Sequence, residues 1–222
     1  CAEIKKAEKE GAKIIVLPEL CITGYTCSDL FLQEKMLREA RQSLLEIAAF
    51  TFALDCIVFV GLPLEYNGKL YNVAAAISDG QVLGMVPKSW IPNYNEFYEM
   101  RHFASGAELS TDVTLPDGSE VLVDREQLFV CEQMNKLKIG VELCEDLWTP
   151  NPPSIAHALA GADVIVNLSA SNEITGKSAY RKELVCGQSA RLVSAYIYAS
   201  AGEGESTQDL VFSGHNLIAE NG

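Results

Sequence analysis

Three residues with reactive side chains each stand at the end of an apolar stretch that is typical of a β-strand. Cys144 follows the run 137–143, and Glu19 and Lys88 follow similar runs much earlier in the chain. In open α/β proteins, ligands bind in the crevice beyond the carboxyl ends of the strands. We therefore expect a thiol, a carboxylate and an ammonium group at the mouth of one site.

The combination of these three side chains favours nucleophilic chemistry without histidine. A thiol attacks as the thiolate, so it needs a base or a nearby cation. His102, His157 and His215 lie outside the three strand ends, which argues against a Cys-His protease dyad. A carboxylate can accept the thiol proton, while an ammonium group lowers the thiol pKa and later faces the oxyanion. An inert alternative stays open at this point, because free cysteine is often core filling and a lone glutamate is usually solvated.

The pattern of apolar residues predicts an α/β protein with a mixed sheet. Asn67-Gly68 and Asp79-Gly80 join three strands as tight hairpins, and the helices between later strands imply parallel pairing. Ser28 or Asp29 is expected to cap the second helix, and Ser154 the third. The expected helices are 1–10, 31–52, 155–160 and 177–193; the expected strands are 13–17, 56–65, 69–78, 81–87, 119–124, 127–132, 137–143, 163–169 and 195–201, with a final hairpin arm at 209–218.

The segment 90–103 is rich in both aromatic and polar side chains. It carries too many charges for a core strand and too many aromatic residues for an ordinary linker. We interpret it as a wall of the active site. A surface loop held by its own aromatic cluster is the alternative.

Composition indicates one domain that binds a small ligand. The chain has 222 residues, of which 48% are hydrophobic, and a formal net charge of −13, which disfavours nucleic acid and anionic membranes as partners. No apolar run reaches the roughly 18 residues that suggest a membrane span. The seven cysteines show no metal-ligand spacing, so we expect no metal, and their number fits a cytoplasmic setting better than a disulfide framework.

Five segments of the chain carry recognisable motifs: Leu17-Pro18-Glu19, 87–99 around Lys88, 142–148 around Cys144, 167–171 and 201–206. The first resembles the motif around the glutamate of the nitrilase (carbon-nitrogen hydrolase) superfamily. The other four resemble, within that superfamily, the glutaminase domain of glutamine-dependent NAD synthetases. This resemblance implies a four-layer α-β-β-α sandwich with mixed sheets.

The same resemblance implies roles for individual residues. Cys144 would be the nucleophile, Glu19 the general base and acid, and Lys88 the oxyanion partner, with L-glutamine as the substrate. Glu145 suits a substrate ammonium and Lys177 a carboxylate, although arginine is the residue expected at position 177. For the segment 201–206, a conformational role is expected, because its acids would repel phosphate. The positions implied to bind substrate are Tyr25, Tyr94, Phe97, Glu145, Ser171 and Lys177.

The resemblance also places the chain within a larger protein. Residues 1–222 would form a single glutaminase domain, an excerpt without the family's first strand and its C-terminal synthetase domain. No cofactor is expected here, whereas ATP and Mg would serve the synthetase domain. A homo-oligomer is expected, with ammonia released for amidation of deamido-NAD. Two alternatives remain: an amidase of the same superfamily acting on another small amide, and a catalytically inert scaffold.

Overall fold

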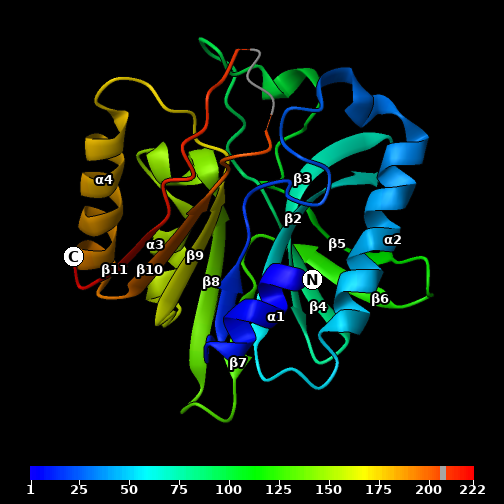
Figure 1. The fold of residues 1–222 in the computed structure, drawn as a ribbon, viewed down its shortest axis with the longest axis horizontal. Coiled ribbons are helices and arrows are strands. Elements are labelled where there is room, and N and C mark those ends of the chain that lie inside the picture. Colours follow the sequence, from blue (N-terminus) through cyan, green and yellow to red (C-terminus); the bar gives the residue numbers. More distant parts are fainter. Residues whose placement is uncertain (206–208) are drawn as a thin grey trace.

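Two β-sheets pack face to face, and helices cover their outer faces (Figure 1). The structure is a computed structural model, and it describes residues 1–205 and 209–222. The expected four-layer α-β-β-α sandwich is thereby confirmed. No helix in these two ranges has the length and apolar character needed to cross a bilayer.

The first sheet has six strands in the order β1-β2-β3-β4-β6-β5. Pairing is parallel between β1 and β2 and between β4 and β6, and antiparallel elsewhere. The mixed sheet and its meander are therefore as predicted. The strands are β1 Ile14–Val16, β2 Ile57–Tyr66, β3 Lys69–Ser78, β4 Gln81–Pro87, β5 Ser110–Thr114 and β6 Glu120–Asp124.

The second sheet has five strands in the order β11-β10-β9-β8-β7. Its three central strands are parallel, as expected from the helical crossovers, and both edge strands are antiparallel to their neighbours. The strands are β7 Leu128–Cys131, β8 Leu137–Leu143, β9 Val164–Ser169, β10 Ala195–Ser200 and β11 Leu217–Glu220.

The helices divide between the two outer faces. Helices α1 (Ala2–Lys9) and α2 (Glu34–Phe50) cover the first sheet, while α3 (Pro153–Leu159) and α4 (Lys177–Leu192) cover the second (Figure 1). Three short 3-10 helices lie in the connecting loops: η1 Ser28–Leu32, η2 Glu99–Arg101 and η3 Cys144–Trp148.

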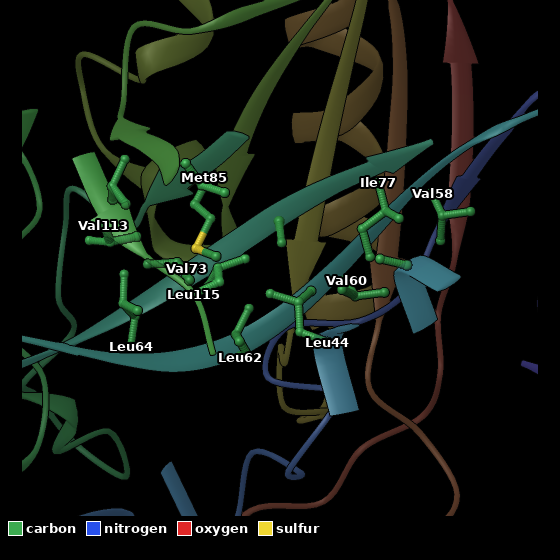
Figure 2. Packing of buried hydrophobic residues seen from close by; sticks show 14 of the residues in the cluster. Leu44, Val58, Val60, Leu62, Leu64, Val73, Ile77, Met85, Val113 and Leu115 are labelled. Atoms are coloured by element: carbon green, nitrogen blue, oxygen red, sulfur yellow. The ribbon is translucent and has the colours of Figure 1, made fainter. Parts of the chain in front are cut away.

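Successive side chains of the first sheet point to opposite faces and pack into two separate hydrophobic cores. On β2, Val58 and Val60 face the helical layer, where they pack with Leu44 of α2 and Met85 of β4 (Figure 2). Phe59 points to the opposite face and packs against the second sheet. This period of two is the normal consequence of strand geometry. The sheets are thus held together by apolar faces, which leaves the loops at their carboxyl ends free to carry polar chemistry.

The hairpin predictions are confirmed by backbone geometry. Asn67 and Gly68 have φ angles of 49° and 70°, and Asp79 and Gly80 have 45° and 80°. Two consecutive positive φ angles define the turn type that suits tight hairpins.

Four sequence predictions about element ends are wrong. Helix α2 begins at Glu34, not Phe31, and neither Ser28 nor Asp29 caps it, because both lie in η1. Ser154 does not cap α3; it lies inside the helix, whose first residue is Pro153. The final hairpin arm, expected at 209–218, is instead the short strand β11, which begins at Leu217 and ends at Glu220. Strand β5 was not predicted, because its sequence, Ser-Thr-Asp-Val-Thr, has only one apolar residue.

Candidate active site

Glu19 is completely buried in the loop that follows β1. Its Oε1 atom accepts hydrogen bonds from Asn72 Nδ2 and Lys88 Nζ, both at 2.7 Å, and its Oε2 atom accepts one from the Ala170 N–H at 2.9 Å. The loop lies directly on β2 at Gly61, where an added Cβ would be only 2.2 Å from the backbone nitrogen of Leu20. A glycine at this position therefore allows the carboxylate to enter the interior.

Lys88 follows β4 and is only 1% exposed. Its Nζ atom lies 2.7 Å from Glu19 Oε1 and 2.8 and 2.9 Å from the two carboxylate oxygens of Glu99. Burial lowers the pKa of Lys88, but the charges of Glu19 and Glu99 outweigh burial and hold this pKa well above its usual value. The ammonium group therefore stays charged inside the protein.

Glu99 completes a buried cluster that the sequence did not reveal. It lies in η2, and its Oε1 atom also accepts a hydrogen bond from the Tyr25 hydroxyl at 2.7 Å. Burial raises the pKa of Glu99 to about 7, against the opposing charge of Lys88. Nothing in the local sequence distinguishes Glu99 from Glu96; only its position within the segment 90–103, expected beside the site, pointed toward it.

Cys144 lies at the carboxyl end of β8, where the strand turns into η3. Its φ angle of 40° is in the left-handed region, which is uncommon for a residue with a side chain. Burial and then the charge of Glu19 raise the pKa of the Cys144 thiol, and Lys88 offsets them only in part. Lys88 lowers the thiol pKa, as expected, but burial dominates, so the pKa of the thiol is raised overall.

A pocket of about 340 Å³ opens above Cys144. Five of the six residues expected to bind substrate line it, namely Tyr94, Phe97, Glu145, Ser171 and Lys177. Tyr25 does not: it lines a separate cavity of about 90 Å³ and holds Glu99 instead. Residues of the segment 90–103 line both the pocket above Cys144 and the cavity beside Tyr25.

Opposite charges flank this pocket. Both carboxylate oxygens of Glu145 lie 3.0 Å from the Tyr94 hydroxyl, and burial raises the pKa of Glu145. The Lys177 ammonium lies 5.3 Å from the ring centres of both Phe97 and Trp148, and burial lowers the pKa of Lys177. An ammonium group over aromatic faces is favourably placed. The sequence did not indicate Trp148 as part of the pocket.

Further polar contacts join the loops around the pocket. Lys177 also donates a hydrogen bond to Asn172 Oδ1, and Asn172 Nδ2 donates to Glu96 Oε1 at 2.5 Å. The segment 201–206 contacts the loop containing Tyr25 through Glu205, whose carboxylate accepts hydrogen bonds from the N–H groups of Tyr25 and Thr26. Ser206, the last residue of that segment, lies outside the described residues.

Asp146 connects the Cys144 turn to the loop after Lys88. Its Oδ2 atom accepts a hydrogen bond from the Leu143 N–H at 3.0 Å, and its Oδ1 atom accepts from the N–H groups of Ser89 and Trp90. No group of three or more His, Cys, Asp or Glu side chains is arranged to hold a metal ion anywhere in residues 1–205 or 209–222.

Known proteins resemble this chain over nearly its whole length. A relative from Mycobacterium tuberculosis (strain ATCC 25618 / H37Rv), named glutamine-dependent NAD(+) synthetase, is 41% identical over 213 residues, which is 96% of this chain and 31% of the relative. A protein of the same name from Thermotoga maritima is 32% identical over 98% of this chain and 34% of its own length. The chain therefore spans about a third of the length of these curated relatives.

Solved structures give the same picture. The crystal structure of a glutamine-dependent NAD(+) synthetase from Cytophaga hutchinsonii superposes with a TM-score of 0.86 at 33% identity, covering 98% of this chain and 35% of that one. A nitrilase-superfamily amidase from Nesterenkonia AN1 shares the fold, with a TM-score of 0.74 at 19% identity, over 97% of this chain and 72% of that one. The carbon-nitrogen hydrolase family matches residues 2–220. This chain belongs to the carbon-nitrogen hydrolase family.

Proposed function

We propose that this chain is the glutaminase domain of a glutamine-dependent NAD+ synthetase. The observation that carries the proposal is the pairing of Glu145 and Lys177 on the walls of one pocket above the buried Cys144. An α-amino acid bears an ammonium and a carboxylate group, so this pair is complementary to the backbone end of glutamine. The side-chain amide would then reach toward the thiol.

The first half of the reaction forms a thioester. Glu19 accepts the proton of the Cys144 thiol while the sulfur attacks the amide carbon, and the resulting oxyanion is stabilised by Lys88. Glu19 then returns the proton to the amide nitrogen, the C–N bond breaks, and ammonia leaves. The raised pKa of the Cys144 thiol agrees with this order of steps, because the proton is removed during the attack rather than before it.

The second half uses water. Glu19 removes a proton from water as its oxygen attacks the thioester carbon, and Lys88 again faces the oxyanion. The C–S bond breaks, the sulfur regains its proton from Glu19, and glutamate leaves. One carboxylate therefore acts in both halves, which requires it to be firmly held; its three hydrogen bonds provide that.

The larger protein is part of the same proposal. The curated relatives are about three times as long as this chain and carry the synthetase name, so we infer a C-terminal synthetase domain that uses ATP and Mg and amidates deamido-NAD with the released ammonia. We further infer a cytoplasmic setting, in keeping with the seven free cysteines, and a homo-oligomer.

Labelling of the nucleophile tests the function. The complete protein should release glutamate from glutamine, and a diazo-ketone glutamine analogue should label Cys144, as located by mass spectrometry. The Cys144→Ala variant should be inactive and unlabelled, and Glu19→Gln should lose roughly 10²- to 10⁴-fold in activity. Labelling of another cysteine would refute the assignment of the nucleophile.

A second measurement separates the alternatives. Glutamate release should rise several-fold when ATP and the acid precursor of NAD are both present, because the two chemistries are coupled. Equal rates without NAD formation would refute the synthetase proposal but leave the amidase chemistry intact. Glutamine being no better than simple amides would indicate an amidase of other specificity, and no thioester under any condition would indicate an inert scaffold.

A further inference from the structure

The outer face of the second sheet is unexpectedly polar beneath its covering helices. Glu142 on β8, Asn167 on β9 and Tyr196 on β10 are all completely buried there. Glu142 and Asn167 are direct partners in the strand register, and Tyr196 lies two residues from Asn167's partner on β10, which puts all three on one face. A sheet face under helices is normally apolar, so each of these polar groups requires a hydrogen-bond partner.

The three side chains form one continuous chain of hydrogen bonds. The Tyr196 hydroxyl donates to Glu142 Oε1, and Asn167 Nδ2 donates to the Tyr196 oxygen at 3.0 Å. Asn167 Oδ1 accepts the backbone N–H of Cys144 at 3.1 Å. The chain therefore runs from a buried carboxylate to the backbone of Cys144.

The direction of these bonds is fixed by Cys144. A backbone N–H can only donate, so Asn167 turns its amide oxygen toward Cys144 and its amide nitrogen toward Tyr196. The Tyr196 oxygen accepts from that nitrogen, and its proton therefore points to Glu142. Glu142 is itself anchored, because its Oε2 atom accepts the Ser154 N–H of α3 at 2.8 Å.

The anchored N–H belongs to a residue in an unusual conformation. Cys144 has a φ of 40°, and such a conformation persists only where surrounding contacts hold it. The hydrogen bond to Asn167 is one of these contacts, and it acts at the residue that carries the sulfur.

We propose that Glu142, Tyr196 and Asn167 form a positioning relay that fixes the backbone of Cys144 and so aims its thiol at the substrate amide. This proposal rests on the proposed role of Cys144 as the nucleophile. None of the three residues contacts the pocket, so they act through Cys144 rather than on the substrate.

Near-isosteric variants of the complete protein test the relay. Tyr196→Phe removes only the hydroxyl, and Glu142→Gln cannot accept from both Tyr196 and Ser154. Both variants should lower kcat for glutamine by about tenfold or more while KM stays within about twofold, because misplacing a reacting atom impairs the chemical step rather than binding. Tyr71→Phe is the matched control: Tyr71 is also buried, at 7% exposed, but it packs in the core of the first sheet and lies outside the relay.

A second readout does not depend on glutamine. The rate of Cys144 alkylation by iodoacetamide, located by mass spectrometry, should fall in both relay variants and not in the control, whereas a purely structural role would lower the melting temperature alone. If the wild-type protein is alkylated at Cys144 but does not hydrolyse glutamine, the proposed function fails and alkylation still decides the relay. Unchanged rates in a folded relay variant, or an equal loss in Tyr71→Phe, would overturn the relay. Should Tyr196→Phe fail to fold, Glu142→Gln decides alone.

Discussion

Asp146 Oδ1 accepts a hydrogen bond from the backbone N–H of Trp90 at 2.8 Å. This bond connects the turn after β8 of the second sheet to the loop after β4 of the first. The same carboxylate binds the N–H groups of Ser89 and Leu143. Lys88 and Cys144 are the immediate neighbours of these bonded residues. This one side chain therefore joins the backbone beside Lys88 to the backbone beside Cys144.

Replacing Asp146 should damage both stability and activity. Asp146→Ala removes the acceptor of three N–H groups; those of Ser89 and Leu143 are buried, and each unsatisfied buried group costs on the order of 1–3 kcal/mol. We expect a loss of at least about 2 kcal/mol in the free energy of unfolding, measured with urea, and a fall in glutaminase activity of more than about tenfold. Asp146→Asn, which keeps one acceptor oxygen, should lose less of both; an Asn variant as damaged as the Ala variant would argue against this account.

Lys88→Met should destabilise the protein and shift the reactivity of the thiol. Without the ammonium group, Glu19 and Glu99 are left as buried carboxylates without a cation, which costs roughly 3–5 kcal/mol. Lys88 opposes the rise in the Cys144 pKa, so its loss should raise this pKa further and move the alkylation profile of Cys144 to higher pH. Activity should fall by at least about 10²-fold. Lys69→Met, at an exposed lysine on β3, is the control, and an unshifted profile in Lys88→Met would remove its electrostatic role.

Glu99 should make stability depend on pH. Burial raises its pKa from 4.5 to about 7, so the folded protein holds this proton more tightly than the unfolded chain does. The stability that results is fully present below the ordinary pKa and is lost as the pH rises through about 7. Urea unfolding across this range should show a decline that Glu99→Gln makes shallower and that the exposed Glu108→Gln leaves unchanged. An identical decline in all three proteins would exclude Glu99 as its source.

Lys177 should govern the affinity for glutamine. Lys177→Met removes the cation proposed to bind the substrate carboxylate, so KM should rise by roughly tenfold or more, with a smaller effect on kcat. Lys177→Arg retains the charge and offers two-point contact, and its KM should stay close to that of the wild type. An unchanged KM in Lys177→Met would show that Lys177 does not bind the substrate carboxylate.

Local chemistry explains which parts of the fold were predictable. The Asn67-Gly68 and Asp79-Gly80 turns need positive φ angles that their residues adopt readily, and the strands that lead to Lys88 and Cys144 are mostly apolar. Such features depend on near neighbours in the sequence. The start of α2 was misplaced because Ser28 and Asp29 have cap-forming side chains, yet Asp29 pairs with the distant Arg101 instead.

The parts that escaped prediction depend on residues that are far apart in the sequence. Glu99 is recognisable only beside Lys88, and Asn167 only beside the N–H of Cys144. The pairing of Tyr25 with Glu99 likewise spans 74 positions, so the sequence did not reveal it; Tyr25 was expected in the pocket only from the family resemblance. The burial that dominates the Cys144 pKa is also a property of the assembled fold.

Gly61 bears on how members of this family are recognised in newly determined genomes. Enzymes are commonly inferred by checking that the reactive residues are present, and Gly61 contributes no reactive group. Yet a side chain at this position would push its Cβ into the backbone at Leu20 and displace the adjacent Glu19. A homologous sequence with glutamate, lysine and cysteine intact but alanine at this position would pass such a check and still be inactive. The absence of a side chain on β2 is therefore as informative about activity as the presence of the thiol.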